Sequence, residues 1–584
     1  MIYDFSWYLR EHDGPATRFA VPPELEDRFI ELVGEVVRSL DPDVVEHHTV
    51  TFLTPVWVDL LAHAYRDPSW RPAAVDRCYA DEAMRLVRLT YRYAGSGPSE
   101  EVLQDGVHVE PAWAKTRALT YFNRTPLHER ILWVPMDGSL EVRLDGTAVA
   151  IRAERSPKKA PRYRRPGRWR RGRLKALILG AVRRVREPAS RLLARSIFRR
   201  RYREAWVLMD RVTDADDNAE RLYEFVRRER PDINAWFVLE PGSPDFRRLQ
   251  HAGEARLVAY GSFAWTMLLL NASWVISSHA DQGVAAPPQI LDLIPAPTWK
   301  FGFLQHGITK DDLSTWLNTR RIDLFVVSTE PELASVIGDG TNYVVTAKET
   351  RNTGLPRFDR LLAKAATVSE AEQDRVIIAP TWRTWLTLPN IARQRRRELR
   401  DEFWVSDYMT AWLALLNSPE IAAAVRSRGW RLGFMPHPNF QHVLEEISMP
   451  DHVEALAFAD TDVQGLYARC SLLITDYSSV AFNLAYLDRP IVYYQFDRDR
   501  VLGGGHLGRK GYFEYERDGF GPVVTDHEAA VAAIVASIER GPRPMADYAA
   551  RIATTFPTRD GRACERVVAA VEELSRPWAR DGAP

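Results

Sequence analysis

Residues suited to phosphate binding stand at 476–479, where the chain reads Asp-Tyr-Ser-Ser directly after an apolar run at 471–475. A second apolar run at 490–494 follows a helical pattern, and this order predicts a strand, a crossover helix and a parallel strand. In open parallel sheets ligands bind beyond the carboxyl ends of the strands, and a helix N-terminus offers N–H groups to an anion. The hydroxyls of Ser478 and Ser479 would add donors for phosphate oxygens, although helix capping alone also explains such residues.

Three further polar side chains follow apolar runs in the same way. His306, which a glycine follows, can take a proton near neutral pH because its unperturbed pKa lies there. Arg383 and His437 come after runs at 376–380 and 430–435, and both suit the phosphates of a nucleotide diphosphate. A histidine after a strand is more often a packed side chain when it stands alone. The prediction of a site therefore depends on these groups occurring together.

Apolar runs and helical patterns alternate through the region that must position these groups. We expect buried strands at 205–209, 235–239 and 274–278, a helix over 215–228, and a second series that opens around 325–328. Such alternation builds parallel sheets covered by helices. The sequence therefore predicts an α/β protein with two Rossmann-like lobes.

Composition limits the class of protein. The chain has 584 residues, 46% of them hydrophobic, which is enough for about three or four domains with sizeable cores. Cys78, Cys470 and Cys564 are far apart and form no CxxC pair, so neither a disulfide framework nor a zinc site is expected. The N-terminus lacks a signal peptide pattern, and no run approaches the roughly 18 to 20 apolar residues of a spanning helix. We expect a protein on the cytoplasmic side.

Residues 1–151 are expected to form a separate accessory domain of unknown role. The segment is acidic and rich in helical patterns, and it ends in apparent hairpin turns at Asp137-Gly138 and Asp145-Gly146. His63 follows Asp59 by one helical turn, but two such groups do not make a metal site. The sequence assigns no chemistry to this domain.

The basic segment 152–203 contains roughly twenty Lys and Arg residues and few acids, although the whole chain has 78 residues of each sign. Prolines break its first part, and apolar residues recur at helical spacing from 174 to 198, which predicts a linker followed by two amphipathic helices. We interpret these helices as binding an anionic membrane surface. A charged helix packed on the catalytic region remains the alternative. Nucleic acid is disfavoured because few aromatic residues lie between the arginines.

Several short stretches together resemble one protein family. They are Gly-Leu-Pro-Arg-Phe-Asp at 354–359, Asp-Tyr-Ser-Ser-Val at 476–480, Asp-Arg-Pro-Ile-Val at 488–492, Gly-Tyr-Phe-Glu at 511–514 and Asp-Gly-Arg-Ala-Cys-Glu-Arg at 560–566. In this order they resemble the CDP-glycerol glycerophosphotransferases, the teichoic acid polymerases and primases. These enzymes have two Rossmann-like lobes, the arrangement called GT-B.

The resemblance covers about 204–575 and implies a division of the chain. The expected parts are an accessory domain (1–151), the basic linker (152–203), a first, acceptor-side lobe (204–325), a second, CDP-polyol donor-side lobe (326–575) and a tail (576–584). The implied reaction moves a polyol phosphate, most simply glycerol phosphate, from CDP-glycerol to a hydroxyl of a lipid-linked or polymeric acceptor. CMP is released, and the product is a teichoic acid-like or capsule polymer. The implied location is the cytoplasmic face of the cell membrane, as a peripheral protein.

The resemblance also implies roles for particular residues. His306 and His437 are the expected catalytic residues, His306 as the base that takes the hydroxyl proton. The expected donor-binding residues are Arg383, Asp476, Ser478, Ser479 and Lys310, and those on the acceptor side are Asp217, Asn218 and His279. No metal and no cofactor are expected, because the acidic residues near the motifs lack paired spacing. Gln305 replaces the tryptophan that family members commonly have before this histidine.

Two other functions fit the same sequence. A GT-B glycosyltransferase of cell-surface polysaccharide synthesis would use a nucleotide sugar, and the fold alone does not separate it from a polyol phosphotransferase. A membrane-surface scaffold that has lost transferase activity would bind CDP without turnover. The polyol, the acceptor and the number of units added are left open.

Overall fold

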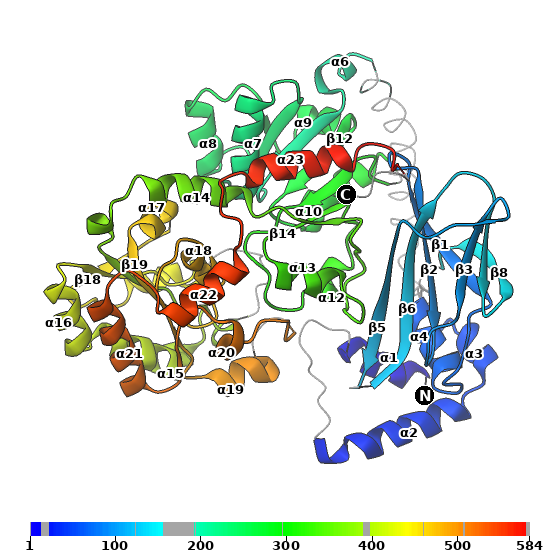
Figure 1. The fold of residues 1–584 in the computed structure, drawn as a ribbon, viewed down its shortest axis with the longest axis horizontal. Coiled ribbons are helices and arrows are strands. Elements are labelled where there is room, and N and C mark those ends of the chain that lie inside the picture. The colour runs from blue at the N-terminus through cyan, green and yellow to red at the C-terminus, as the bar shows by residue number, and fades with distance from the viewer. Residues whose placement is uncertain are drawn as a thin grey trace, which may run out of the picture.

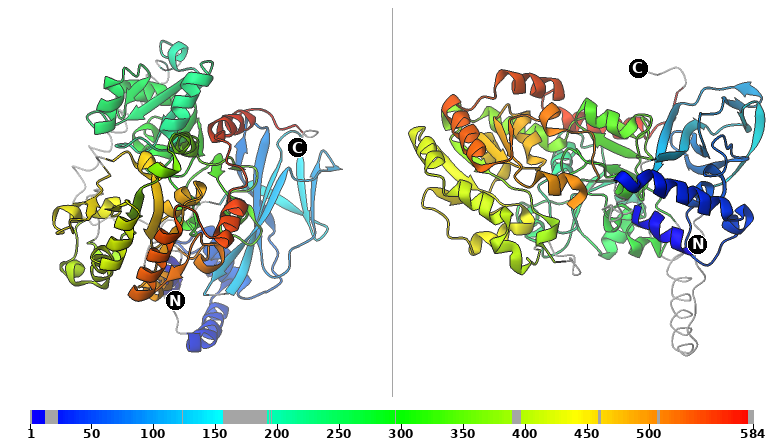
Figure 2. Two further views of the ribbon diagram at one scale, coloured as in Figure 1. Left: turned by 60° about the vertical axis from the view of Figure 1, so that its left-hand side comes forward. Right: turned by 90° about the horizontal axis from the view of Figure 1, so that it is seen from below.

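The computed structural model describes residues 2–12, 23–122, 124–155, 192, 194, 196–294, 296–388, 397–458, 461–505 and 509–579. Three β-sheets organise the chain, and Figure 1 shows them in sequence order from right to left. The N-terminal domain contains an eight-stranded sheet, and the two following lobes contain sheets of seven and six strands. In Figure 2 the N-terminal domain lies at one end of the molecule and the second lobe at the other.

The N-terminal domain is mainly a β-structure that short helices cover at one end (Figure 1). Its sheet has the order β4-β3-β7-β8-β1-β2-β6-β5, in which β1 and β8 pair in parallel and the other neighbours are antiparallel. We expected a helix-rich segment that ends in hairpin turns, so the extent of the sheet is a correction. The elements are α1 (Ile2–His12), α2 (Glu26–Ser39), α3 (Pro42–Glu46), α4 (Pro55–Asp59), the π-helix η2 (Leu60–Ala64), β1 (Ala74–Asp81), β2 (Leu86–Tyr93), β3 (Glu100–Gln104), β4 (Val107–His108), β5 (Trp113–Tyr121), β6 (Arg124–Pro135), β7 (Leu140–Leu144) and β8 (Thr147–Ala153).

A buried ion-pair cluster joins this domain to the first lobe. The Asp81 carboxylate at the end of β1 receives Lys348 Nζ at 2.6 Å and Lys300 Nζ at 2.7 Å. Asp81 and Lys348 are both buried. Tyr79 Oη donates a hydrogen bond of 2.5 Å to Asp323. Because burying these charges is favourable only while each keeps its partner, the cluster holds the two domains in one relative position.

The first lobe is a parallel sheet covered by helices, with the order β11-β10-β9-β12-β13-β14-β15. Every residue of β9 and β10 is buried, which is typical of central parallel strands. The elements are β9 (Ala205–Met209), α7 (Asn218–Glu229), β10 (Ala235–Leu239), α8 (Pro244–His251), β11 (Leu257–Ala259), α9 (Phe263–Leu269), β12 (Ala272–Ser277), α10 (Gln282–Ala285), α11 (Pro288–Leu291), β13 (Lys300–Phe303), α12 (Ser314–Leu317), β14 (Leu324–Val327), α13 (Glu330–Ile337) and β15 (Thr350–Asn352).

The second lobe repeats this architecture with a parallel sheet in the order β18-β17-β16-β19-β20-β21. The predicted α/β fold with two parallel-sheet lobes is thus confirmed. The elements are β16 (Arg375–Ile378), α15 (Asp407–Leu416), α16 (Pro419–Ser427), β17 (Arg431–Phe434), β18 (Val453–Ala455), α17 (Val463–Ala468), β19 (Cys470–Thr475), α18 (Val480–Tyr486), β20 (Ile491–Tyr494), α20 (Tyr515–Asp518), β21 (Val523–Val524), α21 (His527–Arg540) and α22 (Ala546–Thr555).

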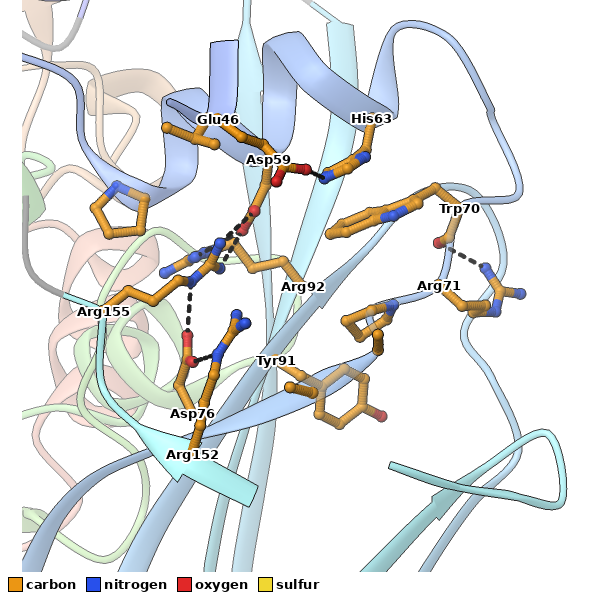
Figure 3. A pocket seen from close by; sticks show the side chains of 15 residues that line it. Glu46, Asp59, His63, Trp70, Arg71, Asp76, Tyr91, Arg92, Arg152 and Arg155 are labelled. Atoms are coloured by element: carbon orange, nitrogen blue, oxygen red, sulfur yellow. Dashed lines mark hydrogen bonds and ion pairs between the residues drawn. The ribbon is translucent and has the colours of Figure 1, made fainter. Parts of the chain in front are cut away.

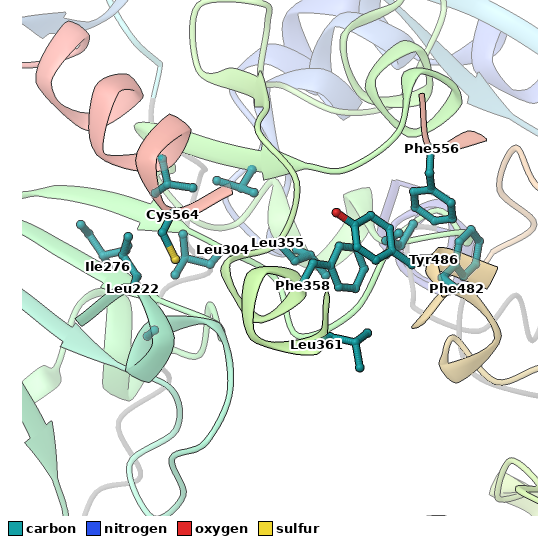
Figure 4. Packing of buried hydrophobic residues seen from close by; sticks show 14 of the residues in the cluster. Leu222, Ile276, Leu304, Leu355, Phe358, Leu361, Phe482, Tyr486, Phe556 and Cys564 are labelled. Atoms are coloured by element: carbon teal, nitrogen blue, oxygen red, sulfur yellow. The ribbon is translucent and has the colours of Figure 1, made fainter. Parts of the chain in front are cut away.

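An apolar cluster continues from one lobe into the other through α14 (Pro356–Ala366). Phe358 of this helix stacks on Tyr486 of the second lobe, with ring centroids 4.2 Å apart. Leu304 and Cys564 belong to the same cluster, and Figure 4 shows them on the other side of Leu355 from these rings. Cys564 belongs to α23 (Ala563–Glu573), the last helix, which returns to pack on the first lobe (Figure 1). The start of α14 is therefore anchored at the junction of the two lobes.

Two of the expected domain boundaries differ from those in the structure. We placed the lobe boundary at 325/326, but β14 and β15 belong to the first sheet, which extends the first lobe to Asn352. Strand β8 runs to Ala153, just inside the segment expected as a linker. Most of the basic segment, including the amphipathic pattern at 174–191, lies outside the described residues. No helix within the described ranges has the length and apolar character needed to cross a bilayer.

Candidate active site

The carboxyl ends of three neighbouring strands bring the predicted acceptor-side residues together. In the register of the sheet, Met209 of β9 lies beside Ser277 of β12, and Ser277 lies beside Phe303 of β13. The segments that follow these strands contain Asp210, His279 and His306, and they therefore leave the same edge of the sheet.

Asp210 orients the start of α7. Its carboxylate accepts hydrogen bonds from the backbone N–H groups of Ala219 at 2.8 Å and Asp217 at 3.1 Å, and from the Ser278 hydroxyl. Burial and the neighbouring Asp217 raise the pKa of Asp210 to about 7, while these donors oppose the rise. Asp210 thus places Asp217 and Asn218 at the sheet edge. Sequence reasoning did not identify it as a site residue, although a carboxylate directly after a buried strand was a usable signal.

Gln305 turns the chain so that His306 leaves the end of β13. Its backbone is in the left-handed region, with φ of 62°, which is unfavourable for a residue with a side chain. The buried amide compensates by donating to Glu332 at 2.9 Å and to the Val326 carbonyl at 2.7 Å. The Asn218 amide donates to the Gln305 carbonyl at 2.7 Å. The glutamine that replaces the family's tryptophan is therefore a structural part of the turn.

The His306 imidazole stacks on His279, with ring centroids 4.6 Å apart and an interplanar angle of 13°. Arg211 Nε donates to His279 Nε2 at 2.8 Å, so this nitrogen carries no proton. Desolvation by the surrounding protein lowers the pKa of His306 to about 4, and Arg211 and Arg357 act in the same direction while Asp217 opposes them. His306 is nevertheless exposed to solvent on one side. His306 is neutral at neutral pH and can accept a proton.

Arg357, at the start of α14, ties His306 to both lobes. Its Nη1 donates to the His306 carbonyl at 2.7 Å and to Asp217 at 2.9 Å, and its Nη2 donates to Asn483 of the second lobe at 3.2 Å. Its backbone N–H donates to Asn218 at 3.0 Å. This residue lies in the family-like turn at 354–359, but we did not predict it as a site residue. Its partners are too distant in sequence for any local pattern to show them.

The two lobes meet where His306 is followed by glycine. A Cβ atom placed on Gly307 would lie 3.1 Å from Ser479 Oγ, closer than ordinary van der Waals contact. Glycine is therefore the residue that allows this approach. It brings the turn after β13 against the Asp-Tyr-Ser-Ser turn after β19, so that His306 and Ser479 belong to one site.

In the second lobe, Asp476 is buried and shapes the serine turn. Its carboxylate accepts the backbone N–H groups of Tyr477 at 2.6 Å and Thr381 at 2.9 Å. Ser478 Oγ accepts the N–H of Val480 at 3.2 Å, while Ser479, which precedes α18, makes no capping bond with its side chain. Asp476 supports the turn from inside, and the serines form its outer part.

Arg383 lies beneath the serine turn, fully buried. Its guanidinium donates to Asp476 at 2.8 Å, to Asp497 at 2.7 and 3.2 Å, and to the Thr381 carbonyl at 2.7 Å. A phosphate could bind this guanidinium only by displacing one of these partners. Direct phosphate binding by Arg383 stays a prediction, and the geometry favours a supporting role.

His437 and Lys310 lie at the margins of the site. His437 follows β17, two strands from β19 and therefore about 10 Å along the same sheet edge. Its Nδ1 accepts the N–H of Asn439, and its ring is 6.2 Å from that of Trp382. Lys310 pairs with Asp311 at 2.7 Å, and its Nζ is 5.8 Å from the centroid of the Tyr515 ring. Their roles toward a donor stay predictions.

Comparison with known proteins identifies related sequences. The Bacillus subtilis minor teichoic acid biosynthesis protein GgaB is 31% identical over 385 residues, which cover 65% of this chain and 40% of that protein. The Bacillus spizizenii teichoic acid poly(glycerol phosphate) polymerase is 37% identical over 98 residues, 16% of this chain and 23% of that protein. The chain thus spans well under half the length of these relatives. A solved structure of the wall teichoic acid polymerase TagF aligns with a TM-score of 0.49 and 15% identity, over 69% of this chain and 97% of that one.

A family model describes most of the two lobes. The model of the CDP-glycerol:poly(glycerophosphate) glycerophosphotransferases matches residues 192–573, well over half of the chain. The family predicted from the short motifs is therefore confirmed, and the chain belongs to the CDP-glycerol:poly(glycerophosphate) glycerophosphotransferase family.

Proposed function

We propose that this protein transfers a polyol phosphate, with glycerol phosphate the first choice, from CDP-glycerol to a hydroxyl group of an acceptor in teichoic acid-like polymer synthesis. One observation carries the proposal. A neutral histidine at the end of a strand in the first lobe directly precedes Gly307, and Gly307 packs against Ser479 in the serine turn of the second lobe. A base and a phosphate-binding turn on opposite lobes are the two parts that a phosphotransfer between bound substrates requires.

In the proposed reaction the acceptor hydroxyl attacks the β-phosphorus of CDP-glycerol. The new bond joins the acceptor oxygen to this phosphorus, and the bond between phosphorus and the bridging oxygen breaks, so that its electron pair leaves with CMP. His306 takes the hydroxyl proton. Because its pKa is lowered, the imidazole is unprotonated before the reaction and need not lose a proton first.

The pyrophosphate would lie along the outer face of the serine turn. The hydroxyls of Ser478 and Ser479 would donate to its oxygens, while Asp476 and Arg383 hold the turn in place from below. Fixed donors of this kind stabilise charge that develops on a leaving phosphate. We propose that protein groups supply this stabilisation without a cofactor, and that His437 contacts the donor from further along the edge.

The acceptor and the place of action are part of the same proposal. A lipid-linked or polymeric polyol phosphate would approach from the first lobe, past Asp217, Asn218 and His279. We further propose that the basic segment 152–203 holds the enzyme on the cytoplasmic, anionic face of the membrane, an interpretation that rests on its sequence alone.

A donor panel tests the proposal. CDP-glycerol, CDP-ribitol and UDP sugars are incubated separately with the protein and a glycerol phosphate oligomer, and release of CMP or UDP is measured. Release of CMP from a CDP-polyol, with none of UDP from the sugars, is the expected result. Release of UDP alone would replace the proposal by a nucleotide-sugar glycosyltransferase, and tight CDP binding without turnover would favour an inactive scaffold.

A further inference from the structure

A cavity of about 520 Å³ lies in the N-terminal domain, within the range of about 300–1,000 Å³ that is usual for small-molecule sites. It is enclosed by the segment α3 to η2 on one side and by β1, β2 and β8 on the other. Because its lining belongs entirely to the N-terminal domain, the cavity is separate from the site formed by the two lobes. The sequence predicted an accessory domain here but no role for that domain.

One wall of the cavity is a ladder of alternating carboxylates and guanidiniums (Figure 3). Arg155 donates to Asp59 at 2.6 and 2.7 Å and to Asp76 at 3.3 Å, and Arg152 Nε donates to Asp76 at 2.7 Å. Arg92 donates to Asp59 at 2.9 Å. Both carboxylates are almost completely buried. Buried charges are expensive to keep, and their concentration around an open space points to a ligand.

The opposite wall is aromatic. Figure 3 shows the Trp70 indole across the cavity from Arg155 and Asp76. One face of this indole is covered by His63, whose ring is parallel to it at 4.7 Å, and His63 is in turn held by Glu46 at 3.2 Å. His63 belongs to the π-helical segment η2, a local conformation frequent at functional sites. Trp70 is half-buried and lines the cavity, so it can receive a flat apolar surface.

The charge balance selects the kind of ligand. Each arginine of this wall already has a carboxylate partner: Arg92 pairs with Asp59 and Glu129, Arg155 with Asp59 and Asp76, and Arg152 with Asp76. An anion would have to compete with these carboxylates. A hydroxyl group both donates and accepts hydrogen bonds, and can therefore bind a carboxylate and a guanidinium together. Among the described residues, the two terminal nitrogens of Arg152 make no contact with a protein acceptor and can bind such an oxygen. A neutral sugar ring combines hydroxyl groups along its edge with an apolar C–H face.

We propose that this cavity binds a neutral saccharide unit, with the C–H face of the ring on Trp70 and its hydroxyls on the ladder of Asp59, Arg155, Asp76 and Arg152. The domain is then a carbohydrate-binding module, held in a fixed position by the Asp81 cluster. The inference does not rest on the proposed function, because it concerns binding alone and a different domain.

Titration of the full chain with neutral saccharides tests the proposal. Glucose, galactose, N-acetylglucosamine, lactose and chitobiose are the probes, with inorganic phosphate and glycerol 3-phosphate as anionic comparisons. Binding is measured by saturation-transfer NMR and calorimetry for the wild type, Trp70→Ala and Arg152→Gln. Trp404→Ala is the matched control, because Trp404 is an exposed tryptophan of the second lobe. Thermal unfolding shows that each variant is folded, and the exposed Arg152 provides a substitution that leaves the core intact.

At least one saccharide should bind saturably, and both cavity variants should weaken its binding about tenfold or more, while Trp404→Ala leaves it within about twofold. The proposal is overturned if no saccharide of the panel saturates the wild type, or if binding is unchanged in both cavity variants. Saturation by phosphate that Arg152→Gln abolishes, without saccharide binding, would also overturn it and identify an anion site.

Discussion

Replacing Arg357 by glutamine should lower turnover strongly while leaving the fold intact. The guanidinium makes two charge-assisted hydrogen bonds beside the proposed base, one to the His306 carbonyl at 2.7 Å and one to Asp217 at 2.9 Å. It also donates to Asn483 across the lobe junction at 3.2 Å. Without it, the segment that carries His306 is free to shift relative to the serine turn.

The expected magnitude follows from these bonds. A hydrogen bond to a charged group contributes about 1.5–3 kcal/mol. If transition-state stabilisation falls by about one such bond, kcat/KM falls by roughly tenfold to 150-fold, since about 1.4 kcal/mol corresponds to a factor of ten. A displacement of about 1 Å of a catalytic group has effects of similar size. CMP release from CDP-glycerol in the presence of acceptor measures the change.

Arg360→Gln is the matched control. Arg360 lies one turn further along α14, and its guanidinium pairs with Asp216 at 2.8 Å, where the Asp216 side chain is 54% exposed. An exposed ion pair contributes little, so this variant should keep nearly full activity. If Arg357→Gln remained folded and released CMP as fast as Arg360→Gln, the assignment of Arg357 as the residue that positions His306 would be wrong.

Three further predictions concern pH and stability. Because its pKa is lowered, His306 is the neutral base at pH 7 and protonates only below the pH at which an ordinary histidine does. The value of kcat/KM should therefore stay constant as the pH falls from about 8 through 6.5, and a midpoint near 6.5 would show an unperturbed histidine. Arg383→Met leaves Asp476 and Asp497 without their guanidinium partner and should lower the free energy of unfolding by about 3–5 kcal/mol, which thermal or urea unfolding measures. An unchanged Tm with a raised KM for the donor would instead indicate that Arg383 binds phosphate directly. Asp81→Ala leaves Lys348 without its carboxylate partner in the domain interface, so it should lower the free energy of unfolding by a similar amount and make the N-terminal domain sensitive to protease. Asp137→Ala removes an exposed pair with Arg85 and should change little. Equal effects of the two substitutions would contradict the role of the cluster.

The central strands of both lobes could be predicted closely from the sequence. The expected strands at 205–209 and 235–239 coincide with β9 and β10, and those at 471–475 and 490–494 differ from β19 and β20 by one residue at the start. Such strands are buried on both faces, so their sequences are continuous apolar runs that a single pattern detects.

Other elements carry no such pattern. Strand β15 reads Thr-Arg-Asn and has no apolar run. The strand expected at 325–328 has one, but an apolar run does not show to which sheet a strand belongs. We placed this strand in the second lobe, whereas β14 pairs with β13 of the first. In the N-terminal sheet, Arg92 and Glu129 form an ion pair inside the protein. These charged residues occupy positions at which a strand with alternating polar and apolar residues would have apolar ones. Propensity and period do not reveal charges that neutralise each other across a sheet.

Only those parts of the candidate site that depend on local sequence could be predicted. Strand ends located His306, His279 and the serine turn, because the position of a residue after a strand is local information. The partners of Arg383 and Arg357 are not local: Asp476 and Asp217 lie 93 and 140 residues away in sequence. Only the folded chain distinguishes an arginine that supports a turn from one that is available to a substrate.

Acceptor-dependent CMP release by the wild type and by His306→Ala is the most direct measurement of the proposed chemistry. Both proteins are incubated with CDP-glycerol, with and without a glycerol phosphate oligomer, after thermal unfolding has shown that both are folded. We predict that the wild type releases CMP only with acceptor present and that His306→Ala loses this release. A folded His306→Ala that keeps most of the wild-type rate would contradict the assignment of His306 as the base, and with it the mechanism proposed for the two lobes.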